Sequence, residues 1–212
     1  MIGMIKMNDL FRRYPELSVC RESLEKAVEM MCETYYNGGK ILVCGNGGSC
    51  ADSEHIVGEL MKSFTLARKI PDEDREKLFS LLGDESKLFV ENLQRGIPAF
   101  SLCSQSGVMT AYNNDVNPDM VYAQLLYACG KKEDLLIGIS TSGNSKNVVN
   151  AVKAAKAFGI KSLCLTGAKE CMLDDFADCI IKVPETETYK IQELHLPVYH
   201  YLCLETEKKL FG

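Results

Sequence analysis

Apolar residues recur along the chain in two patterns, which predict helices and strands. From about residue 8 to residue 36 they follow helical spacing with charges between them, which predicts one or two amphipathic helices. Later, short apolar runs bounded by glycine or proline alternate with stretches of helical period. The predicted strands are residues 40–44, 98–103, 134–139, 160–166 and 179–183, and the helices after the second strand are 121–129, 146–158 and 190–210. This alternation predicts an α/β fold, a doubly wound parallel sheet sandwiched by helices.

One segment interrupts the alternation. Residues 66–94 contain the charged run Pro71–Lys77, followed by several leucines and a phenylalanine, and we interpret them as an exposed helical insertion. The chain has no fixed-period repeat and no stretch rich in Pro, Gly and Ser that would act as a linker. We therefore expect residues 1–212 to form a single domain, with N-terminal helices over about 1–37.

Composition narrows the classes of function. The formal charge is −5, which argues against a nucleic-acid-binding surface. No apolar run approaches the roughly 18 residues of a membrane span, and the first residues lack the pattern of a signal peptide. The ten cysteines include no CxxC pair and lie mostly in apolar segments, which indicates free, mostly buried thiols. These features predict a protein of the reducing cytoplasm without nucleic-acid or membrane partners.

A glycine-rich loop follows the first predicted strand. It consists of Gly45, Asn46, Gly47, Gly48 and Ser49. Its glycines permit close approach of the backbone to a ligand, and ligands of parallel sheets lie beyond the carboxyl ends of the strands. The loop lacks the third glycine of the GxGxxG fingerprint, so we expect no nucleotide cofactor. A turn without a ligand is the alternative.

A second loop, between the strand at 134–139 and the next helix, is rich in hydroxyl groups. Its hydroxyl-bearing residues are Ser140, Thr141, Ser142 and Ser145. Hydroxyls and backbone N–H groups at the start of a helix form an uncharged cradle for phosphate. An ordinary N-cap is the alternative, but one cap does not require four hydroxyls. We therefore expect this loop to bind a phosphate group.

The ionisable candidates lie on two predicted helices. His55 and Glu59 are four residues apart, and Gln192 and His200 are eight apart, so each pair shares one helix face. Together they could form a four-ligand site for zinc or a similar metal, or could act as an acid and a base. Taken singly, a histidine is also consistent with a core or surface residue, which is our interpretation of His195.

In these features the sequence resembles the sugar isomerase (SIS) domain family, and within it the phosphoheptose isomerases. The resemblance spans about Asp9 to Leu210. The residues that carry it are Cys44–Ser49, Asp52, His55, Glu59–Leu60, Asn114–Asp115, Gly138–Ser145, Leu165–Gly167, Ile191–Glu193 and His200. It implies a homotetramer with active sites shared between subunits. It also implies the aldose–ketose isomerisation of sedoheptulose 7-phosphate to a glycero-manno-heptose 7-phosphate through an enediol.

The resemblance further implies a role for each matching residue. Ser140, Thr141, Ser142 and Ser145 would hold the phosphate with Ser49 nearby, and Asn46–Gly48, Asn114–Asp115 and Gln192 would contact the sugar. Glu59 would remove the proton beside the carbonyl, and His200 would move protons between the enediol oxygens. The residues matching the ligands of one zinc ion per site are His55, Glu59, Gln192 and His200.

The sequence departs from the family pattern in three places. Lys62–Ser63 replaces an arginine, Tyr189–Lys190 replaces an Asp–Arg pair, and the 66–94 segment is longer than the resemblance implies. The alternative function is that of a non-catalytic SIS protein, which binds phosphosugars or associates with a replication initiator. Such adaptors lose the acidic and final histidine positions, whereas this chain keeps Glu59 and His200, and function depends on the site rather than the fold.

Overall fold

The computed structural model describes residues 7–212 and has a parallel sheet at its centre. Over these residues the sheet has five strands in the order β2-β1-β3-β4-β5. The strands are β1 (Ile41–Gly45), β2 (Ala99–Ser101), β3 (Leu135–Ile139), β4 (Lys161–Thr166) and β5 (Cys179–Lys182). The predicted α/β class and all five predicted strands are confirmed. Strand β2 is shorter than predicted because the Ser101 hydroxyl accepts a hydrogen bond from Cys103 N and so caps a 3-10 turn, η3 (Leu102–Ser104).

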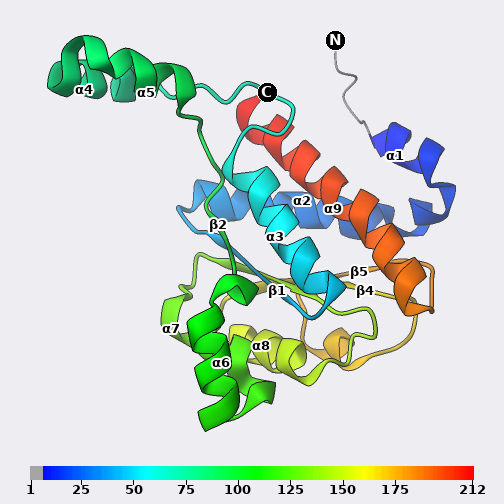
Figure 1. Ribbon diagram of the computed structural model, residues 1–212. Coiled ribbons are helices and arrows are strands. Elements are labelled where there is room, and N and C mark those ends of the chain that lie inside the picture. Colours follow the sequence, from blue (N-terminus) through cyan, green and yellow to red (C-terminus); the bar gives the residue numbers. More distant parts are fainter. Residues whose placement is uncertain (1–6) are drawn as a thin grey trace.

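Helices cover both faces of this sheet (Figure 1). Helices α2 (Arg21–Tyr36), α3 (Gly48–Met61) and α9 (Thr188–Phe211) pack on one face, and α7 (Val121–Cys129) and α8 (Lys146–Ala157) on the other. Successive strand side chains point to opposite faces, so Ile41 and Val43 join the first core, and Leu42 and Cys44 the second. Burial on both faces explains the continuous apolar runs of the strands.

Shorter elements complete the chain. Helix α1 (Met7–Arg13) and the 3-10 turn η1 (Pro15–Cys20) precede α2. Helix α6 (Ser106–Asp115) and the turn η4 (Pro118–Met120) lead into α7, and η5 (Met172–Asp175) lies between β4 and β5. The ten cysteines are all free and six of them are buried. Among the helices described, none has the length and apolarity needed to cross a membrane.

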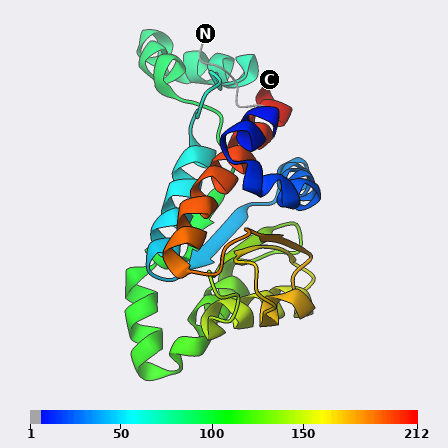
Figure 2. The ribbon, with the colours of Figure 1, turned by 90° about the vertical axis from the view of Figure 1, so that its right-hand side faces the viewer.

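Residues 69–94 of the predicted insertion, which we call the arm, protrude from the sheet and its helices (Figures 1 and 2). The arm contains α4 (Asp72–Leu82), the turn η2 (Gly83–Glu85) and α5 (Ser86–Asn92), and the two helices pack against each other. An antiparallel bridge between Lys69 and Gln94 closes its base. Within the described chain, α4 buries none of its side chains. The helical character predicted for this segment is therefore present, together with exposed apolar side chains such as Leu81 and Leu88.

Candidate active site

The two loops singled out in the sequence open at the same edge of the sheet. Strand β1 lies between β2 and β3, so the strand order reverses there, and open α/β sheets bind ligands at such a switch point. The glycine loop follows β1 and the hydroxyl loop follows β3. Because Gly45 is paired with Ile139 in the sheet, both loops leave it at the same level.

A pair of asparagines ties these loops together. Asn46 Nδ2 donates to Asn147 Oδ1 over 2.8 Å, and Asn147 Nδ2 donates back to Asn46 Oδ1 over 2.9 Å. The buried Tyr122 hydroxyl donates to Gly45 O over 2.6 Å and lies 3.3 Å from Asn46 Oδ1. The glycine loop is therefore fixed from two sides by side chains of the protein itself. Neither Asn147 nor Tyr122 was among the residues predicted for the site.

Gln192 lies directly against the glycine loop. A β-carbon on Gly48 would lie 2.6 Å from Gln192 Nε2, so glycine allows the Gln192 side chain to approach the loop this closely. Ser49, the next residue, is buried in the first turn of α3. The last helix thus brings one of its predicted site residues to the loop that follows β1.

The hydroxyl loop is held in a compact turn. Ser140 Oγ lies 3.0 Å from Ser145 Oγ, and Gly143 N donates to Ser140 O over 3.0 Å. Gly143 has a φ of +64°, a conformation in which other residues are strained. Thr141 and Ser142 face a cavity of about 260 Å³ that Lys169 also lines. The loop therefore presents hydroxyl groups to an open space at the start of α8.

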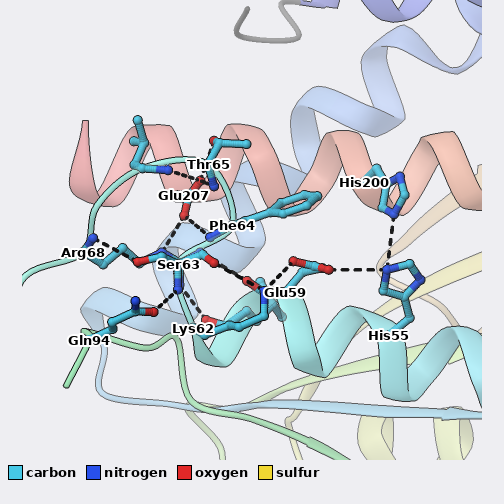
Figure 3. A network of polar contacts seen from close by, with 12 residues as sticks. His55, Glu59, Lys62, Ser63, Phe64, Thr65, Arg68, Gln94, His200 and Glu207 are labelled. Carbon is cyan, nitrogen blue, oxygen red and sulfur yellow. Dashed lines mark hydrogen bonds and ion pairs between the residues drawn. The ribbon is translucent and has the colours of Figure 1, made fainter. Parts of the chain in front are cut away.

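Helices α3 and α9 bring three of the predicted ionisable residues together (Figure 3). His55 Nε2 lies 3.4 Å from Glu59 Oε1 and 3.5 Å from His200 Nε2. Burial lowers the pKa of His200, His55 lowers it further, and Glu59 opposes the change. Lys62 Nζ lies 3.2 Å from the second carboxylate oxygen, Glu59 Oε2. A carboxylate and two imidazoles therefore converge between the two helices.

A partly buried hydrogen-bond chain orients the His55 ring. The Tyr199 hydroxyl donates to Asp52 Oδ1 over 3.2 Å, and its oxygen lies 3.0 Å from His55 Nδ1. Because the hydroxyl proton points to Asp52, the tyrosine oxygen is an acceptor for an N–H group at His55 Nδ1. Burial raises the pKa of Asp52, and the hydrogen bond from Tyr199 opposes this. The sequence analysis did not identify Tyr199, although it is next to His200.

Three other predictions from the sequence concern Asn114 and Asp115, His195, and a metal centre. Asn114 and Asp115 lie on the exposed last turn of α6, where Asn114 Nδ2 donates to Asp115 Oδ1 over 2.9 Å. His195, assigned to the fold rather than the site, is fully buried, and neither ring nitrogen has a hydrogen-bond partner among the described residues. In residues 7–212, no group of three or more His, Cys, Asp or Glu side chains has the arrangement of a metal centre.

Known proteins resemble this chain in sequence and in structure. The SIS domain matches residues 7–74 and 128–202. The phosphoheptose isomerase of Helicobacter pylori (strain P12) is 38% identical over 88% of this chain and 84% of its own length. That of Aliarcobacter butzleri is 36% identical over 92% of this chain and 89% of its own length.

Two solved structures share the fold. The phosphoheptose isomerase of Neisseria gonorrhoeae aligns with a TM-score of 0.74 and 29% identity, covering 95% of this chain and 94% of that one. The enzyme of Francisella tularensis aligns with a TM-score of 0.76 and 26% identity, covering 98% and 100%.

Proposed function

This chain belongs to the phosphoheptose isomerases of the SIS domain family, and from that premise we propose that it interconverts sedoheptulose 7-phosphate and a glycero-manno-heptose 7-phosphate. One observation supports this most strongly. His55, Glu59 and His200 converge between α3, which begins in the glycine loop, and α9, whose Gln192 lies against that loop. Acid–base groups thus accompany the proposed phosphate loop, as an isomerase requires and a binding-only protein does not.

Substrate binding in this proposal begins with the phosphate. The hydroxyls of Ser140, Thr141, Ser142 and Ser145 donate to its oxygens at the start of α8, where the helix dipole favours an anion. The sugar chain extends toward the glycine loop and α3. The residues proposed to contact it are Asn46, Gly47, Gly48, Ser49, Asn114, Asp115 and Gln192.

The chemical step then moves two protons. Glu59 removes the proton from the carbon beside the carbonyl, the electron pair forms the enediol double bond, and the carbonyl oxygen gains a proton. His200 transfers protons between the two oxygens, and Glu59 returns its proton to the former carbonyl carbon. Each transfer requires a positioned group. The 15% exposure of the Glu59 side chain leaves the carboxylate partly accessible to a substrate.

We also propose one zinc ion per site, held by His55, Glu59, Gln192 and His200. Zinc prefers tetrahedral sites with nitrogen and oxygen ligands about 2.0–2.1 Å away, so its ligand atoms lie roughly 3.3 Å apart. The His55–Glu59 and His55–His200 distances of 3.4 and 3.5 Å support the fit of these three residues. Gln192 lies against Gly48, about 12 Å along α9 from His200, and residues 7–212 contain no group of three His, Cys, Asp or Glu side chains arranged as a metal centre. Bound zinc would act as a Lewis acid toward the substrate oxygens.

Three wider proposals accompany this function. The chain is one SIS domain over residues 1–212, which the matches to residues 7–74 and 128–202 support. It acts in the cytoplasm, for which ten free thiols are typical. It assembles as a homotetramer, and the exposed apolar side chains of the arm are suitable for burial between subunits.

The test is an NMR assay of sedoheptulose 7-phosphate conversion by the wild type and by Glu59→Gln and His200→Ala, with added zinc and with a chelator. We expect aldose product from the wild type and a loss of roughly 10²–10⁴-fold in turnover in both variants. Glu54→Gln, an exposed carboxylate of the same helix, is the matched control and should retain full turnover. Phosphosugar binding without turnover in the wild type would instead indicate the non-catalytic adaptor.

A further inference from the structure

An ion pair without any solvent contact lies next to the three converging side chains. The side chains of Arg68 and Glu207 are both fully buried, and Arg68 Nε lies 2.7 Å from Glu207 Oε1 (Figure 3). Glu207 also accepts hydrogen bonds of 2.8 Å from Phe64 N and of 2.8 and 2.7 Å from Thr65 N and Oγ1. Burial raises the pKa of Glu207, but these bonds together lower it, so the carboxylate stays ionised.

The remaining donors of Arg68 reach the end of helix α3. Nη1 donates to Leu60 O over 2.6 Å, and Nη2 donates to Glu59 O over 3.2 Å. These carbonyls belong to the last turn of α3, where no later helical N–H group is available to them. A cation at the carboxyl end of a helix also interacts favourably with the helix dipole. Arg68 therefore caps the helix that carries His55 and Glu59, and it holds the backbone of Glu59 itself.

Glu207 connects the same arginine to the other helix. It lies seven residues after His200 in α9, close to two helical turns, so both residues are on one face. The ends of α3 and α9 are thus joined through a single guanidinium.

We propose that Arg68 and Glu207 are positioning residues, which set the distance between Glu59 and His200 for the isomerase reaction. This rests on the proposed function, because isomerisation is one of the measured properties. Stability alone does not explain the pair, since buried ion pairs are often no more stable than apolar replacements. The planar fork of arginine here uses three separate nitrogens to bind a carboxylate and two carbonyls, whereas the three donors of a lysine share one nitrogen.

The experiment compares Arg68→Lys, Arg68→Met and Glu207→Gln with a structural control. The control is Asp134, whose side chain is 2% exposed and lies 2.5 Å from Lys40 Nζ at the opposite end of the strands. Asp134→Asn removes this ion pair. We expect kcat to fall about 100-fold in Arg68→Met, since a misplacement of about 1 Å can cost that much, with KM changed less than 3-fold. Arg68→Lys, which keeps the charge, should recover part of kcat, and Asp134→Asn should keep all of it.

A second measurement does not depend on turnover. The chain has three histidines, so their ring signals are readily assigned by NMR. We expect the His55 and His200 signals to shift in the Arg68 variants and stay in place in Asp134→Asn. Unchanged kcat and unchanged ring signals in folded Arg68→Lys would overturn the proposal. Shifted signals in a protein without isomerase activity would support the positioning role and refute the proposed reaction instead.

Discussion

Gly143→Ala tests whether the conformation of the hydroxyl loop is needed for phosphate binding. The φ of +64° at this position costs an alanine about 1–2 kcal/mol. The new β-carbon would also overlap Cys171 Sγ and lie 2.6 Å from Cys171 Cβ and 3.0 Å from Thr166 Oγ1. Overpacking of this kind costs about 1–3 kcal/mol, so we expect a total loss of about 2–5 kcal/mol in the free energy of unfolding.

The matched control is Gly159→Ala. Gly159 has a φ of +72°, and a β-carbon there would have only Lys132 Cγ within reach, at 4.0 Å, so this variant bears the strain without the overlap. Replacing glycine by alanine also lowers the conformational entropy of the unfolded chain, and this contribution to the free energy of unfolding is the same in both variants. Urea unfolding should therefore show an extra loss of about 1–3 kcal/mol in Gly143→Ala.

The same substitution should weaken substrate binding. Relief of the overlap requires the loop to move, and a lost hydrogen bond to a charged group costs about 1.5–3 kcal/mol. We therefore expect KM for the sugar phosphate to rise roughly 10- to 100-fold in Gly143→Ala and to stay unchanged in Gly159→Ala. Equal stability losses and equal KM values in the two variants would refute this account of the loop.

Three further predictions concern residues around the site. Tyr122→Phe removes the hydrogen bond to Gly45 O and should destabilise the protein by about 1–2 kcal/mol, measured by urea unfolding. Asn147→Ala should raise KM and change the free energy of unfolding little, because its partner Asn46 is exposed. An unchanged KM would contradict this. Burial lowers the pKa of His195 to about 4, and the Thr166 backbone opposes this change in part, so the folded state binds this proton less readily than the unfolded chain. The stability that neutral His195 contributes above pH 6.5 is therefore lost as the pH falls toward 4. The free energy of unfolding should fall by about 2 kcal/mol between pH 7 and pH 5, and His195→Phe should remove that loss.

The parts of the fold that depend on local pattern were predictable from the sequence. The apolar run ending at Ile139 and the helical period from Lys146 needed only neighbouring residues, and the structure has β3 and α8 there. The meeting of the loops followed from the rule that parallel strands end at one edge. His55 and Glu59 share a face because of their spacing alone.

Contacts between distant segments were not predictable in the same way. Arg68 and Glu207 are 139 positions apart, and neither has a neighbour in sequence that indicates its partner. Asn147 is an ordinary first-turn residue until the fold places it against Asn46, 101 positions earlier. A charged residue on the inward face of the last helix was the available signal for Glu207, because buried charges are nearly always paired.

The paired base of the arm makes its length independent of the rest of the molecule. Lys69 and Gln94 are joined by a bridge, and Arg95 N donates to Arg68 O over 2.8 Å, so the chain leaves and re-enters the body at one place. Closing a loop between adjacent ends depends only weakly on its length. Helices α4 and α5 can therefore be shortened, lengthened or exchanged for a short turn while both ends stay fixed. A change in the length of the arm would therefore alter the surface proposed for subunit contacts and leave the site residues within each subunit in place.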